Sequence, residues 1–155
     1  GMALDMNANM ILEYESGFKA ALWCSQVACS HLNGLRFRVF GELGSLEWNQ
    51  EHPDYLQYTP RGQAPELFAR GAGYLAKYEA SKYSRLPVGH PEGLTIAFAN
   101  IYKNVISAIL KKENGEELTE ADLDFQKAEN GLDGVRFIHK AIESSKKGEW
   151  VDYKD

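Results

Sequence analysis

The stretch from residue 86 to residue 102 reads LPVGHPEGLTIAFANIY and marks the point at which the chain changes from strands to helices. It begins as a rigid loop that contains two prolines and two glycines. From residue 94 onwards, apolar residues recur at spacings of three and four, which predicts a long amphipathic helix. Pro91 fits the first helical position, where its missing N–H costs nothing. The expected helix runs to Lys112 and stops before Asn114-Gly115.

The half of the chain before this stretch predicts a β-meander. Short runs of alternating apolar and polar residues are separated by turns rich in glycine, proline or asparagine, and Asn33-Gly34 is a strong hairpin signal. In the run 35–40, Arg36, Arg38 and Phe40 lie opposite an apolar face, so the second face of the sheet is mixed. About six strands with short turns are expected to be mostly antiparallel, at 9–14, 18–27, 35–40, 45–48, 55–58 and 66–70.

The half after this stretch predicts helices. A polar connector at 116–125 is followed by a helix from Lys127 to Lys147 with an apolar stripe. Gly131 and Gly134 each cost about 1 kcal/mol inside a helix, and we expect close approach to the sheet to compensate for them. Strands first and helices afterwards indicate an α+β fold, a mostly antiparallel open-faced sheet of about six strands with helices packed on one face. We expect residues 3–155 to form this single domain.

Composition excludes several classes of protein. The chain has 155 residues, 44% of them hydrophobic and 25% charged, as in an ordinary globular domain. A net charge of −5 argues against nucleic-acid binding. No apolar run is long enough to cross a membrane and no signal peptide is visible, so we expect a cytoplasmic protein in which Cys24 and Cys29 are buried, reduced thiols. Gly1-Met2 has the appearance of a tag remnant.

Few residues form a pattern typical of catalysis. The pair Gly71 and Gly73 lacks the rest of a dinucleotide-binding loop, and neither a phosphate-binding loop nor a nucleophile elbow is present. The four histidines are scattered without metal-ligand spacing, so we expect no metal. His90 and Glu92 remain. One interpretation is purely structural, a loop that caps the helix. The other places both at the rim of a polar pocket, because a helix N-terminus favours anions and hydroxyl-rich ligands.

Four groups of motifs, in this order and spacing, resemble the C-terminal domain of the Gfo/Idh/MocA oxidoreductases, the glucose–fructose oxidoreductase and inositol dehydrogenase family. Together they span nearly the whole chain, although each is weak alone. They are NANMILEY (7–14) with Gly17; WCSQVA (23–28), HLNGLR (31–36) and GELGSLEW (41–48); GHPEG (89–93) with FANIY (98–102); and NGL (130–132), VRFI (135–138), ESS (143–145) and GEWV (148–151).

The resemblance implies a longer enzyme with an N-terminal Rossmann domain that binds NAD or NADP. Such an enzyme would move a hydride between a sugar or polyol carbon and the nicotinamide. The present domain would form one wall of the substrate site and would form a homo-oligomer through its open sheet face. The family's glycine-rich loop, its Glu-Lys-Pro segment and its Asp-x-x-x-His segment are all missing from this chain. We therefore expect the chain to hold no catalytic or cofactor-binding residue and to be inactive by itself.

Two other hypotheses remain open at this stage. The chain could be a stand-alone, non-catalytic binding or assembly module that acts through its open sheet face. A weaker alternative is a small ligand-binding protein whose pocket lies at His90. A Rossmann motif upstream in the parent reading frame favours the oxidoreductase, and a native start near Met2 favours the stand-alone module.

Overall fold

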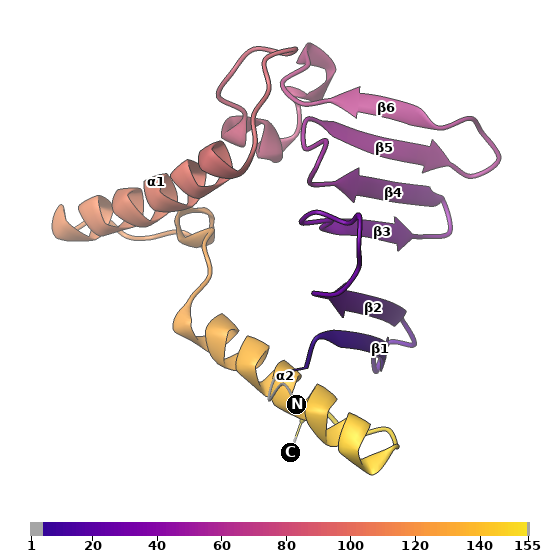
Figure 1. The fold of residues 1–155 in the computed structure, drawn as a ribbon. Helices are drawn as coiled ribbons and strands as arrows, with labels where there is room; N and C mark the ends of the chain where they lie inside the picture. Colours follow the sequence, from indigo (N-terminus) through magenta and orange to yellow (C-terminus); the bar gives the residue numbers. More distant parts are fainter. Residues whose placement is uncertain (1–4, 155) are drawn as a thin grey trace. The chain divides into compact units, whose positions relative to one another are not determined.

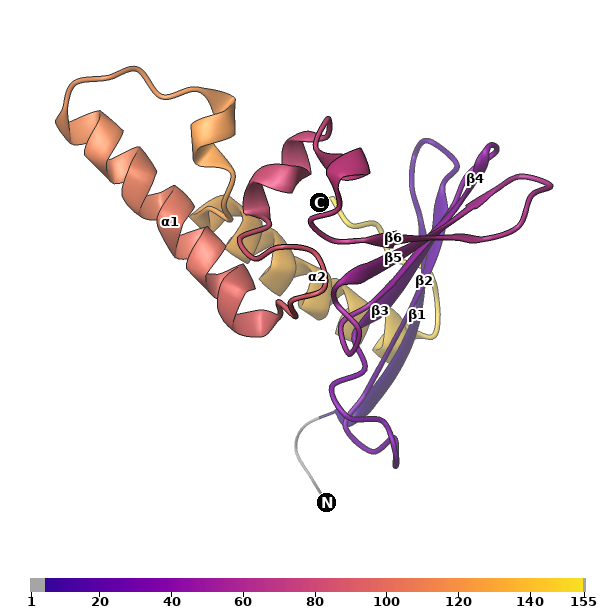
Figure 2. The ribbon, with the colours of Figure 1, turned by 90° about the horizontal axis from the view of Figure 1, so that it is seen from above.

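The computed structural model describes residues 5–154, so the Gly1-Met2 pair lies outside the described residues. Figures 1 and 2 show the chain in two views. The described residues form two compact units. One contains residues 5–31 together with 126–154, and the other contains residues 32–125. Each unit has its own sheet and one long helix.

The first unit contains a two-stranded antiparallel hairpin and the last helix. Strands β1 (Asn7–Glu13) and β2 (Lys19–Ser25) pair along their full length, and Gly17 makes the turn between them with φ of 82°. Helix α2 (Ala128–Lys147) ends at Gly148, whose left-handed backbone forms the C-cap. The expected compensation for the glycines inside α2 is absent, since a Cβ at Gly131 or Gly134 would meet nothing within 4 Å.

The second unit contains a four-stranded antiparallel meander followed by helical segments. Each strand pairs with its neighbour in sequence, in the order β3-β4-β5-β6. The strands are β3 (Arg36–Phe40), β4 (Gly44–Asn49), β5 (Tyr55–Pro60) and β6 (Glu66–Ala69). They lead to the short 3₁₀ helices η1 (Gly73–Leu75) and η2 (Glu79–Tyr83), then to helix α1 (Leu94–Glu113) and the 3₁₀ helix η3 (Glu120–Leu123).

The α+β class and the six antiparallel strands confirm the expected fold. The strands form one sheet of two strands and one sheet of four strands. The Asn33-Gly34 signal predicts a turn, and Gly34 has the left-handed φ of 66° that such a turn uses.

Helix α1 begins later than the position of Pro91 predicts. Its first residue is Leu94 and its N-cap is Gly93, which provides no capping side chain. Pro91 and Glu92 therefore belong to the loop that precedes the helix. Glu92 instead makes long-range contacts that hold this loop in place, as the next subsection describes.

Much of the apolar surface of the described residues is exposed. Among the described residues, Ala72 and Ala108 are the only buried apolar residues. Large apolar side chains of both sheets and both helices are exposed to solvent. The expectation of buried cysteines is wrong, because Cys24 and Cys29 are both free and exposed. Among the described residues, no helix is long and apolar enough to cross a membrane.

Candidate functional site

Asp54 and Arg70 lie side by side because of the strand register. Asp54 immediately precedes β5 and Arg70 immediately follows β6, and the adjacent residues Tyr55 and Ala69 are paired in the ladder. The Arg70 amide continues that ladder by donating to the Asp54 carbonyl at 2.8 Å. The Arg70 Nε–H donates to Asp54 Oδ1 at 2.7 Å. The sheet thus fixes an ion pair at its edge, next to the loop that leads into α1.

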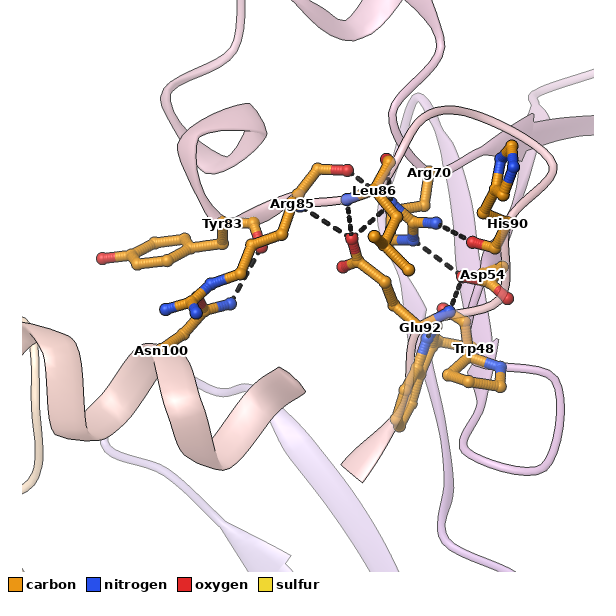
Figure 3. Close-up of polar contacts among 11 residues, drawn as sticks. Trp48, Asp54, Arg70, Tyr83, Arg85, Leu86, His90, Glu92 and Asn100 are labelled. Atoms are coloured by element: carbon orange, nitrogen blue, oxygen red, sulfur yellow. Dashed lines mark hydrogen bonds and ion pairs between the residues drawn. The ribbon is translucent and has the colours of Figure 1, made fainter. Parts of the chain in front are cut away.

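Glu92 joins this pair from the other side (Figure 3). Its side chain is only 5% exposed, and Oε1 lies 3.0 Å from Arg70 Nη1. The same oxygen accepts a hydrogen bond from the Arg85 amide at 2.7 Å and another from the Leu86 amide. The Glu92 amide donates to Asp54 Oδ1 at 3.0 Å. A buried carboxylate is stable only when it is paired and hydrogen-bonded in this way.

Arg70 also donates hydrogen bonds to backbone carbonyl groups of the loop. Its Nη1 donates to the Leu86 carbonyl at 3.1 Å and to Ser84 Oγ, and its Nη2 donates to the His90 carbonyl. A guanidinium can serve so many acceptors because its donors form a planar fork. The His90 ring is exposed and, as Figure 3 shows, points away from Glu92 while its carbonyl points toward Arg70.

The electrostatics of this cluster act on Asp54. The hydrogen bond from Arg70 is the main reason that the pKa of Asp54 lies below its usual value of 3.8, and burial opposes this shift in part. A carboxylate with a lowered folded-state pKa stabilises the fold above its unfolded pKa. That contribution is lost as the pH falls from about 4 through the folded value. Asp54 is therefore ionised at neutral pH, where it forms its ion pair with Arg70.

A second set of contacts attaches the loop to α1. Arg85 Nε donates to Asn100 Oδ1 at 2.7 Å, and Asn100 Nδ2 donates to the Tyr83 carbonyl at 2.8 Å. One turn further along α1, Asn104 Nδ2 donates to the Tyr83 hydroxyl at 3.1 Å. That hydroxyl donates in turn to Asp124. The polar side of α1 is thus used for anchoring, while most of its large apolar residues are exposed.

A groove of about 830 Å³ lies next to the cluster. Asp54, Arg70 and Ser84 belong to its lining, whereas His90 and Glu92 do not. Most of the remaining lining is aromatic or aliphatic, including Phe37, Trp48, Tyr58, Phe68, Tyr78 and Tyr83. Such a lining suits an apolar protein surface better than a hydroxyl-rich ligand.

The described residues do not fit a bound dinucleotide. Every strand pair is antiparallel, so there is no strand–glycine loop–helix unit at which a pyrophosphate would bind. Gly71 and Gly73 lead only into a three-residue 3₁₀ helix. In the part of the chain that the structure describes, no three His, Cys, Asp or Glu residues come together to hold a metal ion.

The structure places both predicted residues on one loop but in different environments. His90 offers an exposed imidazole, and Glu92 has its carboxylate turned into the protein. Sequence reasoning missed Asp54, Arg70 and Asn100, which position this loop. Arg70 follows a strand and Asp54 precedes the neighbouring one, so the hairpin register was a signal that could have paired them.

The chain belongs to the Gfo/Idh/MocA oxidoreductase family. Residues 4–153 match the family model described as the oxidoreductase family, C-terminal alpha/beta domain. This match confirms the resemblance carried by the four groups of sequence motifs.

The relatives are longer than this chain. An uncharacterized oxidoreductase, YfiI, from Bacillus subtilis (strain 168) is 32% identical over 152 residues, covering 97% of this chain and 38% of YfiI. The inositol dehydrogenase homologue from Azotobacter vinelandii, in complex with NAD+, is 36% identical with a TM-score of 0.90, covering 97% and 39% of the two chains. The structure of the A. vinelandii homologue in complex with NADH and myo-inositol is 35% identical with a TM-score of 0.88, and the match covers 97% of this chain and 40% of that chain. The chain therefore spans about two fifths of the length of these relatives.

Proposed function

We propose that this chain is the substrate-side domain of an NAD(P)-dependent oxidoreductase that acts on a sugar or polyol. The main support for this proposal is the family match over residues 4–153. In the relatives, the matched region forms only about two fifths of the chain. A relative in complex with NADH and myo-inositol supports both the cofactor and the class of substrate. The hydride acceptor or donor in this proposal is the nicotinamide of NAD or NADP.

The partner in this proposal is an N-terminal Rossmann domain. In this proposal that domain binds the cofactor and supplies the catalytic groups. Its attachment would also cover apolar surface that this chain leaves open. The free thiols of Cys24 and Cys29 are compatible with the reducing cytoplasm, which is where we place the enzyme.

We also propose a homo-oligomer through the mixed face of the β3–β6 sheet. Phe40 is 70% exposed on this face, and Arg38 stacks over its ring at 5.9 Å. Arg36 forms an ion pair with Glu47 on the neighbouring strand. A surface that carries an exposed aromatic ring and charges of both signs can complement itself across a two-fold axis.

His90 and Glu92 have different roles in the proposed substrate site. The exposed His90 imidazole is the group that contacts a substrate hydroxyl, since an imidazole can both donate and accept hydrogen bonds. Glu92 lies on the same loop, but its carboxylate is turned into the protein. The domain thereby helps to bind and orient the substrate, while the hydride transfer depends on groups outside this chain.

Replacing His90 by alanine tests this assignment. The vehicle is a chimera in which the part of the A. vinelandii homologue that precedes the matched region is joined to this chain. We expect His90→Ala to lower kcat/KM for myo-inositol or glucose by about tenfold, the loss of one substrate hydrogen bond. The dissociation constant for NAD should stay unchanged, because His90 is not part of the cofactor site.

The matched control is His52→Ala. His52 is also an exposed histidine of the second unit, but it lies outside the 84–93 loop. We expect this variant to retain the kinetics of the unmodified chimera. Equal kcat/KM values for the His90→Ala and unmodified chimeras would show that His90 does not contact the substrate.

A further inference from the structure

We infer that Glu92 is a positioning residue that acts on the substrate site only through the loop it holds. This inference rests on the proposed function, because it assigns Glu92 a role at the proposed substrate wall. With Arg70 and Asp54, Glu92 keeps the 84–93 loop in one preformed shape and so presents the His90 ring. It does this without touching the substrate.

The Glu92 carboxylate is occupied by contacts within the protein. Oε1 accepts the amide hydrogens of two successive loop residues, Arg85 and Leu86, and also faces Arg70. With 5% of the side chain exposed, little of the carboxylate remains for a substrate hydroxyl. Turning it outward would leave the two amides and part of the guanidinium unpaired in a half-buried site, which is costly.

The loop is also attached at both of its ends to the same sheet edge. At one end, Arg70 at the end of β6 donates to Ser84 and to the Leu86 carbonyl. At the other end, Arg70 donates to the His90 carbonyl, and Asp54 before β5 accepts from the Glu92 amide at 3.0 Å. A site loop that is fixed to rigid elements in this way holds its geometry before the ligand arrives.

In this arrangement, Glu92 affects the binding of substrate only by positioning His90. If the carboxylate only shapes the loop, its removal should misplace the imidazole and should add little to the loss already caused by removing the imidazole. If it contacts the substrate directly, the two losses should add. The two roles can therefore be separated by experiment.

The structural part of the test is amide hydrogen exchange, measured by NMR on the 155-residue chain. We expect Glu92→Ala to speed exchange of the Arg85 and Leu86 amides by at least about tenfold, because both lose a charged acceptor. Glu92→Gln keeps an oxygen at the same position and should restore most of the protection. The exposed Glu117→Ala is the matched control and should leave both amides unchanged. If Glu92→Ala does not fold, the shorter Glu92→Asp should show the same faster exchange.

The kinetic part of the test uses the chimera. Glu92→Ala should lower kcat/KM for myo-inositol or glucose about as much as His90→Ala, and the double variant should be no worse than His90→Ala alone. Glu92→Gln should stay within about threefold of the unmodified chimera. Additive losses, or a Glu92→Gln variant that keeps its amide protection but loses turnover, would overturn the inference. So would unchanged exchange at Arg85 and Leu86 in a folded Glu92→Ala chain. A chimera without any turnover counts against the proposed function, whereas the exchange data still decide the role of Glu92 as the residue that holds the loop.

Discussion

Replacing Arg70 by methionine is expected to lower the free energy of unfolding by roughly 3–5 kcal/mol, the cost of removing one partner of a largely buried ion pair. Arg70 is 19% exposed and faces both Asp54 and the nearly buried Glu92. Methionine fills much of the same volume but offers no donor, so Glu92 would be left as an uncompensated charge. Urea unfolding followed by circular dichroism measures the change.

Two further variants show whether this loss has the stated cause. Arg61→Met removes a positive charge from an exposed turn of the same unit and should change stability by less than about 0.5 kcal/mol. Adding Glu92→Gln to Arg70→Met removes the unpaired charge and should recover part of the lost stability. A loss below about 1 kcal/mol for Arg70→Met would mean that solvent, rather than Arg70, balances Glu92.

The second large effect concerns the exposed apolar surface. Joining this chain to the preceding part of the A. vinelandii homologue should raise its melting temperature by about 10–20 °C relative to the isolated chain. An inter-domain interface of roughly 1,000 Å² gains up to about 25 kcal/mol at about 25 cal/mol per Å² before opposing costs. If only about 5 kcal/mol of this gain remains, the expected shift follows. Differential scanning calorimetry measures it.

Binding of a hydrophobic dye measures the exposed apolar surface independently of the melting temperature. The isolated chain should bind the dye through exposed residues such as Phe98, Ile101 and Ile109 of α1, and the chimera should bind much less. Light scattering on the isolated chain checks that self-association does not hide the same surface. Equal melting temperatures and equally weak dye binding for a monomeric isolated chain and for the chimera would show that the two parts do not cover each other.

Local patterns predicted the elements of the fold well. Alternation in the run 35–40 and the three-and-four spacing after residue 94 correspond to β3 and α1, because side chains repeat every two residues along a strand and every 3.6 residues along a helix. The predictions that were wrong concern contacts with residues distant in the sequence. The close approach expected at Gly131 and Gly134 is absent, since a Cβ added at either residue would meet nothing within 4 Å. Pro91 is excluded from α1, whose N-cap is Gly93, two residues later.

The candidate site was predicted only in part for the same reason. The motif GHPEG indicates His90 and Glu92, because polar groups before a helix can be recognised in the sequence. Arg70, which makes the most contacts with this loop, is separated from Glu92 by 22 positions and carries no local motif. Its role comes from the β5–β6 register, which sets it beside Asp54. Long-range ion pairs of this kind are decided by topology and not by spacing.

Nicotinamide reduction by the isolated chain and by the chimera, each supplied with NAD+ or NADP+ and with myo-inositol or glucose, tests the proposed function most directly. We expect the chimera to bind the cofactor and to oxidise at least one of these substrates. The isolated chain should neither bind the cofactor nor reduce it. Turnover by the isolated chain would contradict the claim that it is only the substrate-side domain. A folded, cofactor-binding chimera that oxidises neither substrate would contradict the proposed sugar or polyol activity.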